Sequence, residues 1–326
     1  MIRPRTTVLA ALLPFAFGLS ACGGGGEGGA AADFPEKRID YVLPFDPGGE
    51  SDITARLQQK PLEEELGQSV SISYQPGAGG ALGWSELTRS RPDGYTVMGC
   101  NIPHIILQPM QRDDAGYTTE QIKPVYFFQS TPNALLVSAD SEMETLDDFI
   151  AAAKEDPGAM SVGGSGDFSA NHIGTLQLSD IAGIDVSYTP FDGTGAAVPA
   201  LLGGHVDALM SYTPQIDQLG DQVKALAVAS EERMEGLDVP TFQEQGIDMA
   251  DGAFRGVCVQ EDTPQEIVDQ LAEVFAAVNE DEALVEDFRD QAFVLENYGP
   301  EESVELIERR TGEYEELLDK LGLLDG

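Results

Sequence analysis

Basic residues are scarce in this chain of 326 residues: 18 lysines and arginines stand against 57 aspartates and glutamates, a formal net charge of −39. Such a field repels phosphate backbones and anionic head groups, which excludes nucleic acid and a bare lipid surface as partners. The acidic residues are spread along the whole chain. We interpret this charge as an adaptation to a salty exterior, where a short Debye length screens the self-repulsion.

Histidine and cysteine are equally rare, with three of each. Cys100 and Cys258 lie far apart in apolar, strand-like runs, and we expect two separate buried thiols rather than a disulfide. The histidines lack metal-ligand spacing, so no metal site is expected from His104, His172 and His205.

Catalytic motifs are missing as well. Residues 163–167 read GGSGD, which differs from the G-x-S-x-G nucleophile elbow because the last residue is aspartate. Residues 77–83 imitate a dinucleotide fingerprint, but the spacing is one residue too long and Pro76 opens the segment. A phosphate loop ending in Gly-Lys-Ser/Thr does not occur. We therefore expect neither an enzyme nor a cofactor.

The N-terminus carries the one long apolar run. Arg3 and Arg5 precede an almost wholly apolar stretch over residues 8–17, which is too short to span a bilayer and is typical of a secretory signal. Residues 19–22 read LSAC and resemble a bacterial lipobox, whose cysteine is diacylated. We predict a lipoprotein signal peptide over residues 1–22 with Cys22 as the lipidation site; an ordinary signal peptide is the alternative.

The Gly-rich residues 23–34 are expected to form a flexible tether. No later stretch approaches 18 consecutive apolar residues, so the mature protein is expected to be anchored to a membrane without crossing it. The predicted location is outside the cytoplasm, periplasmic or at the cell surface, through a lipid on a bacterial membrane.

From residue 38 onward, short apolar runs alternate with amphipathic segments, which predicts an α/β fold with mostly parallel sheets. Helices are expected over 51–66, 146–154, 169–182 and 195–202 and in the tail, and Pro61 should kink or shorten the first. The expected strands are 39–45, 70–74, 95–99, 125–129, 134–137, 160–162, 186–188, 206–210, 223–229 and 255–259.

Three loops bring backbone amides to the start of a predicted helix: residues 47–52, 163–169 and 191–195. Unpaired N–H groups and the positive end of the helix dipole favour a carboxylate at such places. Each loop alone is also an ordinary turn, in which Ser51 or Asp52 would simply cap the helix. Three of them at strand ends, without catalytic motifs, favour a binding cleft over an active site.

The sequence resembles the TctC-like, or Bug, receptors of tripartite tricarboxylate transporters over nearly all of residues 34–321. The motifs that carry the resemblance follow in the family's order: 45–52 with Ala55 and Arg56, 66–68, 75–80, 91–96, 164–166 with His172, 189–193, 202–207, and 240–242 with Glu244 and Gly246.

This resemblance implies a type II periplasmic-binding-protein fold, α/β in class, with two lobes and a ligand cleft between them. Lobe 1 would comprise residues 35–130 and 240–326, and lobe 2 residues 131–239. It also implies a monomeric extracytoplasmic solute-binding protein that captures a small carboxylate-containing molecule for integral membrane transporter subunits. The alternative is a receptor that signals ligand occupancy to a membrane sensor.

The resemblance further implies which residues bind ligand. Backbone amides of the first loop would hold a carboxylate with Asp52 supporting the loop, and the second lobe would close over it. The expected ligand-binding residues are Phe45, Gly48, Gly49, Ser51, Asp52, Ser165, Gly166, Asp167, Phe191, Gly193, Thr194 and Asp207.

Three acidic residues, Glu50, Asp167 and Asp192, stand where the family more often has small, hydroxyl or basic residues. Either the acidic bias of the chain placed them there, pointing to solvent, or they face the cleft. In the cleft they would disfavour a dianion or trianion, and the ligand would carry an amine or amide or bind as a cation complex.

Overall fold

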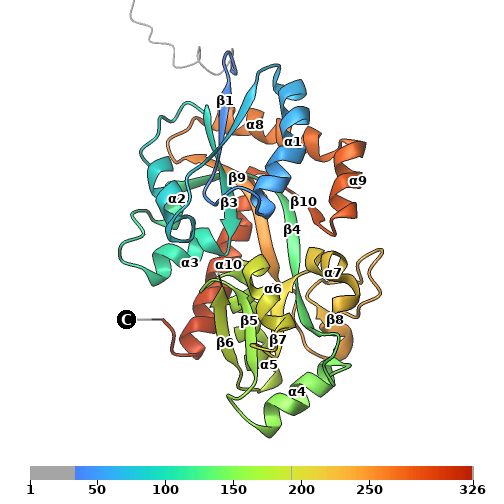
Figure 1. Cartoon of the computed structure of the whole chain (residues 1–326). Helices are drawn as coiled ribbons and strands as arrows, with labels where there is room; N and C mark the ends of the chain where they lie inside the picture. The colour runs from blue at the N-terminus through green and yellow to red at the C-terminus, as the bar shows by residue number, and fades with distance from the viewer. Residues whose placement is uncertain (1–33, 192, 325–326) are drawn as a thin grey trace, which may run out of the picture.

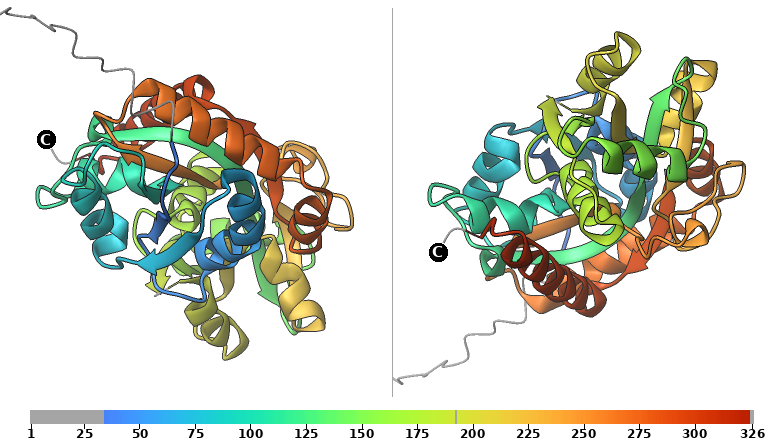
Figure 2. Two further views of the ribbon diagram at one scale, coloured as in Figure 1. Left: turned by 90° about the horizontal axis from the view of Figure 1, so that it is seen from above. Right: turned by 90° about the horizontal axis from the view of Figure 1, so that it is seen from below.

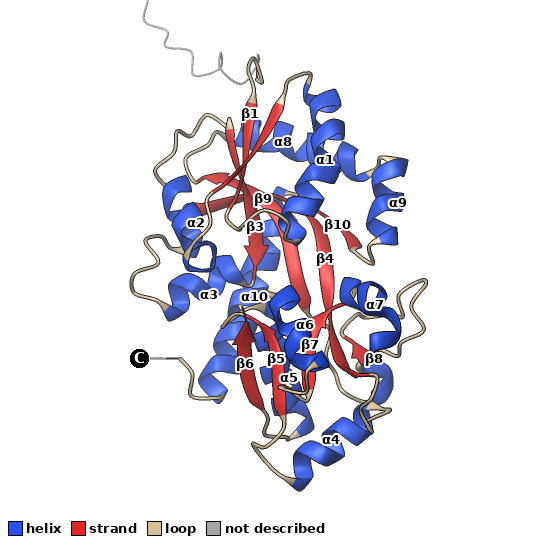
Figure 3. Ribbon diagram, in the orientation of Figure 1, coloured by secondary structure: helices blue, strands red, loops and turns tan. Residues whose placement is uncertain are grey.

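Within the residues that the structure describes, ten strands form one curled sheet that runs through both ends of the molecule, with helices packed outside it (Figures 1 and 3). The structure is a computed structural model and describes residues 34–191 and 193–324. The strand order is β2-β1-β3-β9-β4-β7-β5-β6, and β8 and β10 pair with β4. The α/β class expected from the sequence is confirmed, but the expectation of mostly parallel strands was wrong. The outer strands of each lobe pair in parallel, whereas every pairing of β4 and β9 is antiparallel, because these two strands cross between the lobes in opposite directions.

The first lobe is built on one portion of this sheet. Its strands are β1 (Ile39–Leu43), β2 (Val70–Tyr74), β3 (Thr96–Ile102), β9 (Gly252–Gln260), β10 (Val294–Tyr298) and the first part of β4 (Ile122–Ser138). One face of the sheet packs against α1 (Glu50–Leu66), α8 (Gln265–Asn279) and α9 (Glu282–Asp290). The other face packs against α2 (Ala81–Leu87), α3 (His104–Gln111) and α10 (Pro300–Lys320).

The second lobe is built on the other portion of the sheet. Its strands are the last part of β4, β5 (Ser161–Ser165), β6 (Ser187–Phe191), β7 (Ala208–Tyr212) and β8 (Val223–Val228). The helices α4 (Leu146–Glu155) and α5 (Ala170–Ala182) supply residues to one hydrophobic cluster. The helices α6 (Thr194–Leu202) and α7 (Pro214–Leu219) supply residues to another, on the other side of the sheet.

Strand β4 is the physical link between the lobes: Figure 1 shows it running from one lobe to the other, and Figure 2 shows its curvature. It pairs with β9 as far as Pro132 and with β7 from Asn133 onward. The expected separate strands at 125–129 and 134–137 are therefore one strand, because both partners hold it extended. Helix α10 also reaches both lobes, since Lys320 forms an ion pair with Asp180 of α5 (2.6 Å).

The predicted lobe boundaries stay a proposal. The first, between residues 130 and 131, agrees with the change of partner along β4. The second, between 239 and 240, is less well supported, because Phe242, Ile247 and Met249 pack in a hydrophobic cluster of the second lobe. These contacts favour a second crossing at the start of β9.

Two local features differ from the sequence predictions. Helix α1 continues through Pro61 to Leu66, because the flanking residues Ala55 and Leu62 are buried in the first lobe's core, and that packing overrides the missing N–H. Strand β10 and helices α3 and α7 were not predicted. The two helices have only eight and six residues, whereas β10 is as long as the predicted strand β2. Across the part of the chain that the structure describes, no helix is both long and apolar enough to span a membrane.

Candidate functional site

Asp52 fixes the shape of the loop between β1 and α1. It is 5% exposed, and its carboxylate accepts hydrogen bonds from the Gly48 N–H (2.8 Å) and the Tyr74 hydroxyl (2.7 Å). The Arg56 Nε lies 2.8 Å from the same carboxylate. Burial alone would raise the pKa of Asp52, but these contacts outweigh it and hold the pKa below its usual value. The predicted supporting role of Asp52 agrees with this geometry.

The loop leaves the start of α1 open. Gly48 adopts a φ of +86°, a left-handed conformation that favours glycine, and Gly49 is the N-cap of α1. No described side chain caps this helix, so its first N–H groups remain available to an anionic ligand. Ser51, in the first turn, accepts a hydrogen bond from the Asn101 amide through its hydroxyl (3.1 Å).

Phe45 opens this loop and packs on two rings of the first lobe. Its ring lies edge-on to Trp84 (6.0 Å between centroids) and to His104 (5.4 Å). Burial, together with the positive charge of Arg255, lowers the pKa of His104 to about 4. His104 is therefore neutral at pH 7.

The second loop follows β5 and is fixed by Asn171. Ser165 donates both its N–H (3.1 Å) and its hydroxyl (2.5 Å) to Asn171 Oδ1. Asn171 in turn donates to Asn133 Oδ1 on β4 (3.0 Å), which ties the loop to the strand that links the lobes. Ser169 caps α5 by accepting the His172 N–H (3.3 Å). Ser165 and the adjacent Gly166 are thus held at the end of β5.

Two aromatic rings and one acid complete this loop. Phe168, at φ +56°, donates its N–H to His172 Nδ1 (3.1 Å), and the His172 ring stacks on Tyr188 at 4.2 Å. Burial lowers the pKa of His172, and Asp167 only partly opposes this. The Asp167 side chain is 66% exposed and lies 3.9 Å from His172, so Asp167 points largely to solvent.

The third loop starts α6. Phe191 ends β6, and Gly193, at φ +86°, is the N-cap of α6 with no described side chain over it. Thr194 is the first residue of the helix. Asp192 lies outside the described residues.

Asp207 lies apart from the other predicted site residues. It accepts hydrogen bonds from the N–H (2.8 Å) and the hydroxyl (2.6 Å) of Ser161, at the start of β5. Ser165 and Gly166 follow at the opposite end of that strand. The structure gives Asp207 the role of fixing the β5–β7 edge.

Arg255 of β9 lies where the lobes meet and contacts α1, β4 and the second-lobe strand β7, and sequence reasoning missed it. Its side chain is 10% exposed and forms a short ion pair with Glu50 of α1. It also donates to the Thr131 hydroxyl of β4 (3.0 Å), and that hydroxyl donates to Glu50. Gln129 of β4 donates to the same carboxylate (3.3 Å). We call Glu50 and Arg255 the interlobe pair. The sequence signal that could have indicated this pair was Arg255 itself, a lone arginine in an apolar strand, because a buried charge needs a partner.

Tyr212 contacts both Ser165 and the interlobe pair. The Arg255 guanidinium lies over the Tyr212 ring, 5.9 Å from its centroid. Burial is the main reason that the pKa of Tyr212 is raised to about 12. Arg255 and a hydrogen bond with Ser165 partly oppose this rise, whereas the Glu50 carboxylate adds to it. The start of α1, the crossing strands and the end of β5 therefore converge on one place.

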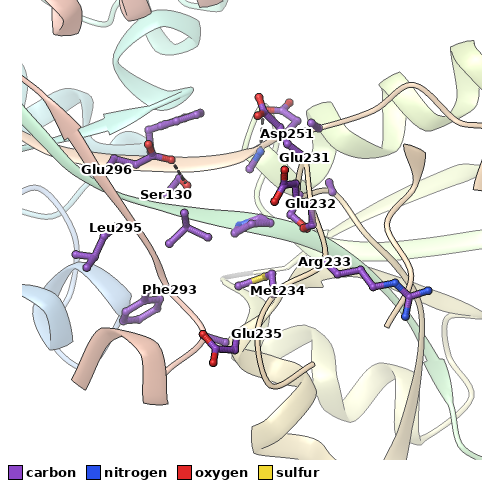
Figure 4. Close-up of a pocket in the computed structure, with 18 of the residues that line it drawn as sticks. Ser130, Glu231, Glu232, Arg233, Met234, Glu235, Asp251, Phe293, Leu295 and Glu296 are labelled. Carbon is purple, nitrogen blue, oxygen red and sulfur yellow. Dashed lines mark hydrogen bonds between the residues drawn. The ribbon is translucent and has the colours of Figure 1, made fainter. Parts of the chain in front are cut away.

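A separate cavity of about 620 Å³ lies on the opposite face of the crossing strands (Figure 4). Ser130 and Phe254 line it, whereas their neighbours Thr131 and Arg255 belong to the interlobe network, as side chains alternate along strands. Ser130 donates to Glu296 there (2.6 Å). None of the predicted ligand-binding residues that the structure describes lines this cavity.

The described residues also bear on metals and thiols. Within residues 34–191 and 193–324, no group of three or more His, Cys, Asp or Glu side chains is arranged to hold a metal ion. Cys100 and Cys258 are both buried free thiols, as expected.

Two α/β lobes joined by crossing strands, with loops of both lobes meeting beside them, define a periplasmic-type solute-binding protein. The sequence matches the family described as "Tripartite tricarboxylate transporter family receptor" over residues 54–323. The chain belongs to this family, so it is an extracytoplasmic solute-binding protein and a receptor rather than an enzyme.

Individual relatives agree with this assignment. Protein BugT of Bordetella pertussis is 29% identical over 222 residues, 67% of this chain and 68% of that protein. A TctC solute binding protein from Polaromonas, solved without ligand, is 29% identical with a TM-score of 0.73, covering 88% of this chain and 99% of that one. MatC of Rhodopseudomonas palustris, solved with bound malate, is 25% identical with a TM-score of 0.77, covering 87% and 100%. The predicted fold and family are confirmed; the ligand contacts of individual residues stay predictions.

Proposed function

We propose that this protein captures a small carboxylate-bearing molecule between its lobes and delivers it to an integral membrane transporter. The observation that carries the proposal is the uncapped start of α1 at Gly49, which lies next to the interlobe pair through Glu50. Free backbone N–H groups and the helix dipole at such a start favour a carboxylate. The malate held by MatC supports the same chemistry.

The two lobes would share the ligand. In the first lobe, the amides of Gly49 and Ser51 would hold the carboxylate. The N–H of Gly48, which the sequence also placed among the ligand contacts, is taken by Asp52, which keeps the loop in place. In the second, Ser165 and the loops that start α5 and α6 would close over it. The ligand contacts proposed for the second lobe are Ser165, Gly166, Gly193 and Thr194, with Phe191 beside them.

Delivery to a membrane transporter rests on the family description and on the lipobox at residues 19–22. Cys22 lies outside the described residues. A diacyl anchor on Cys22 would keep the receptor at the membrane that holds its transporter. Cys22→Ala is expected to abolish incorporation of labelled palmitate and to release the protein from membranes. A receptor that signals to a membrane sensor would still bind ligand, but uptake would not depend on it.

Ligand capture is tested by a thermal-shift screen of the purified protein against mono-, di- and tricarboxylates, amino acids and aromatic acids, at low and high salt. A ligand that binds only the folded state must raise the melting temperature. Selective stabilisation by a carboxylate, absent for its amide analogue, is the expected result. Equal shifts for acid and amide would contradict carboxylate recognition.

A further inference from the structure

Glu50 places a protein carboxylate inside the proposed ligand site. Its side chain is 18% exposed, so it does not point to solvent as general acidic bias would predict. It is the first residue of α1, between Gly49 and Ser51, whose amides would hold the ligand. Any carboxylate bound at those amides therefore lies within a side chain's length of the interlobe pair.

Arg255 is already charge-compensated. Its guanidinium binds Glu50 and the Thr131 hydroxyl, so a ligand anion would have to displace a carboxylate that belongs to the protein. Displacement would leave Glu50 buried without its cation, which is strongly unfavourable. The other basic side chains of the two loops offer no substitute, because Arg56 binds Asp52 and the lowered pKa values of His104 and His172 keep both neutral.

Four aromatic rings lie in or beside the first two loops. Phe45 of the first lobe and Phe168 of the second pack against the same hydrophobic cluster. Tyr188 and Tyr212 add two further rings beside Ser165. Such a lining accommodates the apolar part of a ligand more readily than a second ionised group.

On the basis of the proposed function, we infer that the site selects monocarboxylates with an uncharged remainder over dicarboxylates of the same skeleton. A second carboxylate would be buried beside these two loops, where each described basic side chain is already paired or neutral. This preference differs from the dicarboxylate held by MatC.

The test measures dissociation constants by calorimetry for matched acids: butyrate and succinate, hexanoate and adipate, benzoate and terephthalate. The wild-type protein should bind the monocarboxylate of the fitting pair at least about tenfold more tightly. Glu50→Gln keeps the size of the side chain and frees Arg255. Two unit charges about 6 Å apart at a dielectric of about 20 change a binding constant by about 100-fold. The ratio of the dissociation constants of the two acids in a pair should therefore shift about 10- to 100-fold in favour of the dicarboxylate in this variant.

Two further variants separate charge from folding effects. Glu50→Gln with Arg255→Gln removes both charges and should return the ratio to within about threefold of wild type. Glu296→Gln removes the same charge on the opposite face of the crossing strands and should leave the ratio unchanged. Circular dichroism checks that each variant is folded.

The other possible results of these binding measurements contradict either this inference alone or the proposed function as well. Dicarboxylate binding to the wild type as tight as monocarboxylate binding would overturn the inference alone. The inference would also be overturned if folded Glu50→Gln showed the same ratio of monocarboxylate to dicarboxylate affinity as the wild type. If no acid of any pair binds folded wild-type protein, the proposed function fails and the inference falls with it.

Discussion

Glu50 and Arg255 lie 205 positions apart in the sequence and form an ion pair where the crossing strands meet the start of α1. Gln129 is the direct cross-strand neighbour of Arg255, and both act on the Glu50 carboxylate. One charged pair thus connects the first helix to both crossing strands. Its loss should affect stability as well as ligand choice.

Removing one member of this pair should cost more than removing both. Arg255→Gln leaves the Glu50 carboxylate buried and unpaired, which should lower the free energy of unfolding by about 3–5 kcal/mol. Adding Glu50→Gln should recover most of that loss. Urea unfolding of the two single variants and the double variant gives the coupling energy. Additive effects of the two substitutions would show that the pair is not energetically coupled.

The Asp52 carboxylate should matter for ligand affinity. Asp52→Asn weakens the hydrogen bonds that fix the loop at Gly48, so affinity for a carboxylate should fall about tenfold or more. Asp148→Asn is the matched control, because Asp148 caps α4 in the second lobe through Thr145. It should lower stability modestly and leave affinity unchanged. Equal losses of affinity would mean that Asp52 acts only through overall stability.

Glu296 should make stability fall as pH rises. Burial raises the pKa of this carboxyl, Ser130 and Tyr298 partly oppose the shift, and Glu231 adds to it. A raised folded-state pKa stabilises the protein below the unfolded pKa, near 4.5, and that stability is lost as pH rises through the folded value.

Glu296→Gln removes this titration while keeping an oxygen for the Ser130 hydroxyl. The variant should therefore melt higher than wild type at pH 7, and the difference should shrink toward pH 4. Melting curves between pH 4 and pH 8 measure it. Parallel curves for the two proteins would assign the pH dependence to other groups.

Salt should stabilise the folded protein. The net charge of −39 is repulsive in the compact state, and molar salt shortens the Debye length to about 3 Å. The melting temperature is expected to rise from dilute buffer to molar sodium chloride, with sucrose as a control that leaves charge unscreened. A melting temperature no higher in molar salt would refute the proposed adaptation to a saline exterior.

Local patterns predicted most elements of the fold, because strand runs and helix starts depend on neighbouring residues. The loops at 47–52 and 163–169 were predicted as places where backbone amides gather, and the structure brings Ser165 and Glu50 to the same junction through Tyr212. Asp207 was grouped with them because its motif follows in order, yet strand β5 separates it from Ser165.

The sequence alone determined the α/β class, the acidic surface and the helix starts that favour a carboxylate, since composition and local periodicity carry these properties. Only the tertiary structure decided that Glu50 turns inward to Arg255 while Asp167 faces solvent. The contact between Glu50 and Arg255 depends on the register between β4 and β9, which sets Gln129 opposite Arg255 and directs both to one face. Register joins residues far apart in the chain, so no local pattern specifies it.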